Sequence, residues 1–226
     1  MMASMSFLRS AEARREEHIR LARLVQPTTL AADRLLPVLP PLAQLMPHGG
    51  LHRGTVVTVS GSLRLALALA AGITQADLWV AAAGIPELGV VAAAETGVAL
   101  QRLALIPHPG AQWARVVATL LHAIDLVITR SPATRGQHVC HQLATRARER
   151  GSVLIVLGAW PSPDLNLQVD HESWIGLEAG AGDLHGAGYL QQRRVRVITT
   201  GRGGATRPRE ARLWLPFRDG TVQLAT

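Results

Sequence analysis

The sequence predicts an α/β protein, in which a mostly parallel sheet is flanked by helices and followed by a C-terminal antiparallel β-hairpin. Two observations carry this prediction. Between residues 54 and 157, short and continuously apolar segments alternate with helical segments, which is typical of a parallel sheet buried on both faces. Two runs of alternating polarity, at 193–199 and 210–216, then flank a glycine-rich stretch, as the strands of a hairpin do.

The N-terminal region is expected to project from this sheet. Residues 8–25 have a helical pattern that Pro27 ends, with almost no apolar stripe in the first turns. Such a helix is either solvated or docks on a partner. The candidate partner contacts are Arg14, Arg15, Ile19 and Leu24. The predicted organisation is a charged helix at 1–26, a proline-rich linker or wrap at 27–53, and a core domain at 54–226 with its hairpin at 193–216.

The elements of the core follow from buried runs and helix-ending glycines. Strands are expected at 55–60, 78–83, 103–106, 125–129 and 152–157, and a short last strand at 221–225. Helices are expected at 63–71, 90–96, 113–122 and 138–150, with Gly72 as the C-cap of the first. Residues 158–188 contain Pro161, Pro163 and many glycines, which indicates a long loop.

Composition narrows the class of protein. The 226 residues are 48% hydrophobic, which is enough for a sizeable core. Cys140 is the one cysteine, so no intramolecular disulfide is possible and a reducing compartment fits. The N-terminus lacks the apolar stretch of a secretory signal, and the longest apolar run, 65–71, is too short to cross a bilayer. We therefore expect a soluble, cytoplasmic protein without a membrane partner.

The sequence contains no lysine, so arginine alone carries the 23 Lys-plus-Arg positions and the formal charge of +7. High genomic GC content explains the type of cation, because it favours arginine codons. The excess of positive charge has a second interpretation, an electrostatic footprint for nucleic acid or an acidic partner.

Residues 54–72 have the layout of a phosphate-binding P-loop, which is a buried strand, a glycine turn and an apolar helix. The motif G-x-x-x-x-G-K-[ST] is missing, since Gly61, Ser62, Leu63 and Arg64 occupy the turn. The planar guanidinium of Arg64 is a poor substitute for the compact P-loop ammonium. A shortened loop also removes the backbone N–H groups that cradle phosphate. The sequence predicts a plain strand-to-helix turn and no bound cofactor.

The order of these segments resembles the RecA core. The stretch at 54–59 resembles the strand that leads to the RecA P-loop, 92–105 a helix and the following strand, and 123–131 the Walker B strand. More specifically, the chain from about residue 33 onward resembles the ImuA-prime family, the RecA-like member of the actinobacterial mutasome. The phrases that carry this resemblance are LPVLPPLAQLMPHGGLHRG, AAAETGVALQRLALIPHPG, ARERGSVLIVLGAWP and RPREARLWLP.

The resemblance implies a non-catalytic accessory protein of damage-induced mutagenesis, made in the SOS response. Such a protein works with ImuB, a relative of the Y-family polymerases, and indirectly with an error-prone C-family DNA polymerase and the sliding clamp in translesion synthesis. RecA and DNA are further possible partners, and the protein would be associated with the nucleoid when engaged.

The resemblance also indicates which residues occupy the other positions of a RecA-type nucleotide site. Where the Walker B strand of RecA ends in Asp-Ser, this sequence has Arg130-Ser131, and a cation there would repel Mg²⁺. Asp125 stands at the other end of the strand. Depending on alignment, Ile85 or Glu87 falls near the position of the catalytic base. We therefore expect no ATPase activity and no catalytic residue.

Three further groups of residues are candidates for a metal site, a partner contact or a nucleic-acid contact. His138, Cys140 and His141 cannot share one helix face, so a metal site is not expected. Exposed tryptophans would be partner hot spots, the candidates being Trp160, Trp174 and Trp214. The arginine-rich hairpin could contact an acidic partner or nucleic acid, or guard a sheet edge. Its candidate contacts are Arg193, Arg194, Arg196, Arg202, Arg207 and Arg209.

Two alternatives to the adaptor stay open. The first is a RecA-like module that binds single-stranded DNA directly, although the basic stretch lacks the interleaved aromatics of a stacking platform. The second is a cell-division inhibitor of the SulA type, since that fold also descends from the RecA core.

Overall fold

The computed structural model describes residues 34–132, 136–177 and 188–225. The chain divides into two compact units, Met1–Leu35 and Leu36–Thr226, and the first lies almost wholly outside the described residues. The predicted helix at 8–25 and its candidate contacts Arg14, Arg15, Ile19 and Leu24 therefore fall outside the part of the chain that the structure describes.

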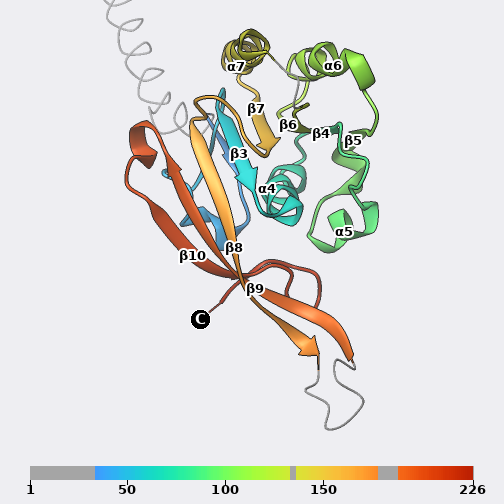
Figure 1. The fold of residues 1–226 in the computed structure, drawn as a ribbon, viewed down its shortest axis with the longest axis vertical. Helices are drawn as coiled ribbons and strands as arrows, with labels where there is room; N and C mark the ends of the chain where they lie inside the picture. Colours follow the sequence, from blue (N-terminus) through green and yellow to red (C-terminus); the bar gives the residue numbers. More distant parts are fainter. Residues whose placement is uncertain (1–33, 133–135, 178–187, 226) are drawn as a thin grey trace, which may run out of the picture. The chain divides into compact units, whose positions relative to one another are not determined.

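A central sheet organises the second unit. Within the described residues it has nine strands in the order β11-β10-β9-β8-β3-β7-β6-β4-β5 (Figure 1). The six strands from β8 to β5 are parallel, while β9, β10 and β11 extend the sheet with antiparallel pairings. The strands are β3 (Val56–Ser60), β4 (Val80–Ala83), β5 (Leu103–Ile106), β6 (Leu126–Arg130), β7 (Val153–Leu157), β8 (Leu165–Leu177), β9 (Gly188–Gly201), β10 (Arg209–Trp214) and β11 (Gln223–Leu224).

Helices cover both faces of the parallel part. In Figure 1, α4 and α5 lie on one side of strands β3 to β7, and α6 and α7 lie on the other. The α-helices are α3 (Pro40–Ala43), α4 (Leu63–Gln75), α5 (Val90–Glu95), α6 (Trp113–Leu120) and α7 (Gln137–Arg150). The short 3-10 turns are η1 (Leu100–Arg102), η2 (Gly110–Gln112) and η3 (Gly203–Ala205), and β1 (Leu35–Pro37) pairs with β2 (Gly50–His52) in a small sheet.

The strand sequences explain why the core has two halves. Side chains alternate across a strand, so Val153, Ile155 and Leu157 of β7 join the hydrophobic cluster that contains α4. Leu154 and Val156 of the same strand join the cluster beneath α6 and α7. A continuously apolar strand is stable here because each of its faces has its own helix layer. The predicted α/β class with a mostly parallel sheet is confirmed.

Helix α4 is longer than predicted. Gly72 is buried in its interior and does not cap it, since the helix continues to Gln75. A Cβ atom at Gly72 would stand 2.7 Å from the backbone of Val38. This glycine therefore permits a close crossing of two backbone segments, which the sequence pattern alone does not distinguish from a helix end.

The predicted loop at 158–188 is wrong at residues 165–177, because β8 occupies Leu165–Leu177, and residues 178–187 lie outside the described residues. The prolines and glycines at either end concealed a run of alternating polarity. Leu165, Leu167 and Val169 point into the core, and the polar residues between them are more exposed. This strand pairs with β3 on one side and β9 on the other. It thus joins the parallel and antiparallel parts of the sheet.

The C-terminal hairpin is confirmed, with a first strand that is longer than predicted and a second that begins one residue earlier and ends two residues earlier. β9 and β10 pair antiparallel from Arg194↔Trp214 to Arg209↔Thr199. The last strand is reduced to Gln223–Leu224. Among the described residues, no helix is both long and apolar enough to cross a membrane.

Candidate functional site

The turn between β3 and α4 is the position at which a P-loop would bind phosphate. Strand β3 ends at Ser60, and only two residues separate it from the start of α4 at Leu63. Gly61 makes the turn with a φ of +85°, and a Cβ atom there would stand 2.6 Å from the carbonyl oxygen of Val169 in β8. Ser62 caps the helix, since its hydroxyl accepts a 3.3 Å hydrogen bond from the N–H of Leu65. The predicted strand-to-helix turn is confirmed.

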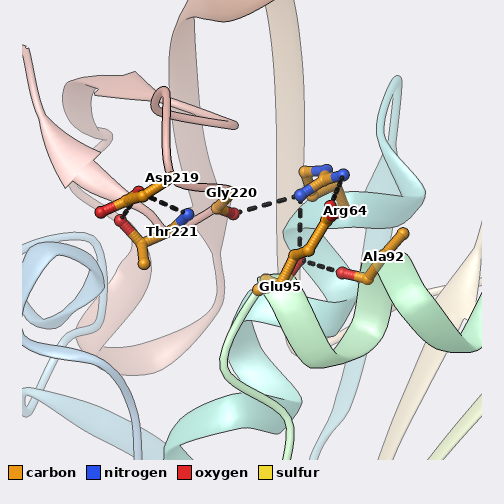
Figure 2. Close-up of polar contacts among 7 residues, drawn as sticks. Arg64, Ala92, Glu95, Asp219, Gly220 and Thr221 are labelled. Carbon is orange, nitrogen blue, oxygen red and sulfur yellow. Dashed lines mark hydrogen bonds and ion pairs between the residues drawn. The ribbon is translucent and has the colours of Figure 1, made fainter.

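Arg64 is engaged in contacts with the chain itself. Its guanidinium donates to the carbonyl oxygen of Gly220 at 3.1 Å and to the hydroxyl of Thr96 at 3.3 Å. It also forms an ion pair of 3.4 Å with Glu95. Figure 2 shows the C-terminal turn and the end of α5 meeting at this side chain. Arg64 therefore ties together three segments that are distant in sequence.

The turn that carries Gly220 is itself held by hydrogen bonds. The carboxylate of Asp219 accepts from the hydroxyl of Thr221 at 2.6 Å and from its N–H at 2.9 Å (Figure 2). These bonds, the hydroxyl first, lower the pKa of Asp219. Gly220 has a φ of +84°, and a Cβ atom there would stand 2.6 Å from Cβ of Glu95. The C-terminal turn thus packs closely against the end of α5.

Arg193 fills the other side of the β3–α4 turn. It donates to the hydroxyl of Ser62 at 3.2 Å and to the carbonyl oxygen of Leu215 at 3.1 Å. Its guanidinium carbon lies 5.4 Å from the ring centroid of Trp174, the geometry of a cation–π contact. Burial and, secondly, the neighbouring Arg64 guanidinium lower the pKa of Arg193. The guanidinium remains protonated at any physiological pH.

A shallow pocket of about 490 Å³ remains beside these contacts, lined among others by Arg64, Trp174 and Phe217. The backbone N–H of Leu65, in the first turn of α4, is already bonded to Ser62. The features that a P-loop uses for phosphate, a long glycine loop and a lysine, are thus replaced by a compact turn and two bonded arginines.

The end of β6 carries Arg130, where the resemblance placed the Walker B position. Arg130 forms an ion pair with Glu87, and both side chains are about half exposed. A hydrogen bond from its own backbone N–H is the first cause that lowers the pKa of Glu87; burial, the second cause, opposes it, and the hydrogen bond and charge of Arg130 lower the pKa further. Glu87, weighed as a catalytic base, is therefore engaged with a cation.

Asp125 directly precedes β6, at the end of the strand opposite Arg130, as the sequence predicts. Its carboxylate pairs with Arg53 at 3.0 Å and accepts from the N–H of Trp79 at 3.1 Å. Arg53 also donates to the carbonyl oxygen of Gly151. These bonds join strand ends on the amino side of the sheet, which is a structural role.

The arginines of the hairpin do not form one surface. Arg194 and Arg196 share a strand face, as alternation predicts, and Arg196 forms a 2.8 Å ion pair with Asp170. Arg202 and Arg207 are exposed near the hairpin tip. Arg193 and Arg209, the two other candidate contacts, are half-buried and donate hydrogen bonds to groups of the chain itself. Arg209 donates to the carbonyl oxygen of Pro47 at 3.4 Å.

The three candidate tryptophans also differ. Trp160 is only 7% exposed and belongs to the core beneath α6 and α7, so its prediction as a partner contact is wrong. Trp174 is 46% exposed. Trp214 is half-buried, with its ring centroid 6.4 Å from that of Phe217. Trp174 is thus the tryptophan best placed for an external contact.

The residues weighed as metal ligands do not converge. Cys140 is buried, whereas His138 and His141 are exposed on α7. Across residues 34–132, 136–177 and 188–225, no group of three His, Cys, Asp or Glu side chains could hold a metal ion.

Comparison with known proteins assigns a family to the part of the chain that contains the β3–α4 turn. Residues 44–162 match the family described as the MT3502 N-terminal domain. The chain belongs to this family. It is also 38% identical over 120 residues to the uncharacterized protein Rv3395c of Mycobacterium tuberculosis, an alignment that covers 51% of this chain and 59% of the relative. The chain thus matches 59% of that relative's length.

The MT3502 N-terminal domain region includes the β3–α4 turn, Arg130 and both helices α6 and α7. It does not include β9, which supplies Arg193, or the turn between β10 and β11, which supplies Gly220.

Sequence reasoning missed the residues that hold Arg64. Glu95, Thr96 and Gly220 approach it only because α5 and the C-terminal turn pack beside α4. One local signal was usable, the Asp219-Gly220 pair that is typical of a tight turn. Nothing local indicates where that turn packs.

Proposed function

We propose that this chain is a non-catalytic, RecA-like adaptor of damage-induced mutagenesis, which binds an ImuB-type relative of the Y-family polymerases and supports error-prone translesion synthesis. The observation that carries the non-catalytic part is the engagement of Arg64 and Arg193 with acceptors of the chain itself. A cation that must stabilise a transferring phosphoryl group cannot be committed to structural bonds at the same time.

The parallel sheet supports the RecA-like part of the proposal. Strand β3, which leads into α4, is an interior strand of the sheet, with β7 on one side and β8 on the other. In open α/β sheets, ligands bind at the carboxyl ends of such interior strands. This is the place from which a nucleotide site would have been lost while its supporting fold was kept.

The ImuB part rests on the resemblance of the four sequence phrases, two of which lie within the family's matched region. It is tested by co-expressing this chain with tagged ImuB from the same genome and measuring the purified material by light scattering. We expect a complex of defined mass. A well-folded chain that elutes alone, at concentrations of about 10 μM, contradicts the adaptor.

Direct binding of single-stranded DNA is a second candidate, favoured by the exposed Arg202 and Arg207. It predicts affinity for an oligothymidylate that falls steeply with salt. The inward direction of Arg193 and Arg209 weakens it, because a phosphate-binding surface would lose two of its six candidate cations. Anisotropy of a labelled oligonucleotide with Arg202→Gln and Arg207→Gln separates this candidate from the adaptor.

A further inference from the structure

A groove of about 600 Å³ runs between α6 and α7, on the face of the sheet opposite α4. Its apolar lining comes from Ala114 and Ala118 of α6 and from Val139 and Leu143 of α7. Leu143 is buried, and the other three side chains are half-buried against the same core cluster. The groove therefore has a small-residue, aliphatic floor that is continuous with the core.

Two arginines stand beside this floor, Arg146 from α7 and Arg115 from α6, and His138 and His141 also line it from α7. All four are exposed. Glu149 is the one acidic residue of the lining.

The two arginines of the groove have no partner within the described residues. Neither Arg115 nor Arg146 forms an ion pair or a side-chain hydrogen bond there. Arg64 and Arg193, by contrast, are each bonded to two or more groups of the chain. Guanidinium groups beside an apolar groove suit a ligand that carries carboxylates and apolar side chains together.

We propose that the α6–α7 groove binds an acidic amphipathic helix of a partner polypeptide. A third helix packs into the groove between two others by the same ridges-into-grooves geometry that joins helices in proteins. Its apolar stripe lies on Ala114, Ala118, Val139 and Leu143, and its carboxylates face Arg115 and Arg146. Helix α7 has 14 residues, or about 21 Å, so the bound segment spans three to four turns.

The lining favours a polypeptide over a nucleic acid. No aromatic side chain lines the groove to stack on bases. An aliphatic floor contributes nothing to phosphate binding, and Glu149 opposes it. The proposal is independent of the adaptor function, since it concerns the chemistry of the ligand and holds for any partner that carries such a helix.

The test uses the full chain and a fluorescein-labelled 14-residue peptide with leucines at helical spacing and glutamates on the remaining face. Anisotropy is expected to show saturable binding, and Arg115→Gln with Arg146→Gln to weaken it by about tenfold. The matched control is Arg148→Gln with Arg150→Gln, which removes the same charge from exposed positions of α7 outside the groove. That pair is expected to change affinity less than about twofold.

A second variant tests the shape of the groove without changing its charge. Ala118→Leu fills the floor with a good helix former and is expected to weaken binding of the peptide by about fivefold while the circular dichroism of the protein stays unchanged.

An oligothymidylate of 20 nucleotides is titrated in parallel. The proposal is overturned if the peptide does not bind, if the control pair weakens it as much as the groove pair, or if Ala118→Leu has no effect. Loss of oligonucleotide binding alone in the groove pair would assign the arginines to nucleic acid. Association with ImuB is measured separately, so either idea can fail without the other.

Discussion

The β3–α4 turn and the α6–α7 groove both carry two arginines, and the structure uses them in opposite ways. At the turn, Arg64 and Arg193 donate to a carbonyl, a hydroxyl or a carboxylate of the chain itself. In the groove, Arg115 and Arg146 are exposed and make no such bond within the described residues. Identical side chains thus stabilise the fold in one region and remain available to a ligand in the other.

This difference indicates which regions of the fold are open to a ligand. The carboxyl end of β3 is where a P-loop protein holds its phosphates, and here a glycine turn, a serine cap and two bonded arginines fill that place. The open, cation-lined hollow lies instead on the other helix layer. We infer that the turn contributes stability and that external contacts belong to other surfaces.

The largest expected effect contrasts one glycine from each region. Gly61→Ala puts a Cβ atom 2.6 Å from the carbonyl oxygen of Val169 at a φ of +85°, and it should lower the free energy of unfolding by about 3 kcal/mol. Gly136, the N-cap of α7, has a φ of −77° and open space around it. Gly136→Ala should cost less than about 1 kcal/mol. Urea unfolding measures both, and equal losses would remove the contrast.

The next prediction contrasts one arginine from each region. Arg193→Met leaves Ser62 and the carbonyl of Leu215 without their donor, and should cost about 2 kcal/mol. Arg146→Met removes a side chain that has no bond within the described residues, and should change stability by less than about 0.5 kcal/mol. Thermal unfolding of the two variants under one condition decides this. A loss at Arg146 as large as that at Arg193 would contradict the assigned roles.

A smaller effect concerns the C-terminal turn. Arg64→Gln removes the guanidinium that holds the carbonyl of Gly220, so the turn should open more often. The amide of Phe217, which donates to the carbonyl of Thr221 at 2.8 Å, should exchange with solvent roughly fivefold faster. Arg115→Gln in the groove serves as the control and should leave this amide unchanged. Unaltered exchange in Arg64→Gln would mean that the turn is held by other contacts.

The smallest effect is a titration at the end of β6. The pKa of Glu87 is lowered in the folded protein, so its contribution to stability is present above its ordinary pKa and is lost as pH falls through the folded value. Arg130→Gln should raise this pKa only in part, because the backbone N–H of Glu87 is the first cause of the shift. Carboxyl chemical shifts follow the titration, with Arg146→Gln as the control. No response to Arg130→Gln would show that the pair is absent in solution.

The sequence predicted the parallel core because its signals are local. Runs such as 152–157 are apolar on both faces, and that pattern has few stable solutions other than a covered parallel strand. The degenerate turn was equally visible, since Gly61 and Arg64 stand where a longer loop and a lysine belong. Strand β8 was missed because prolines and glycines at its borders outweighed the alternation of Leu165, Leu167 and Val169.

The residues that fill the turn could not be predicted, because their contacts span long distances in sequence. Arg64 and Gly220 are 156 residues apart, and Arg193 and Ser62 are 131 apart. The alternation of β9 predicted that Arg194 and Arg196 share a face, but it could not show that Arg193 meets the end of β3. The groove has the same origin, since its lining depends on α6 lying beside α7.

The central claim, that the β3–α4 turn is a structural junction and not a nucleotide site, is tested most directly by calorimetric titration of the full chain with magnesium–ATP. We expect no saturable heat up to about 1 mM nucleotide, which corresponds to binding weaker than about 4 kcal/mol. Saturable binding that Arg64→Gln abolishes and Arg115→Gln leaves intact would contradict the account.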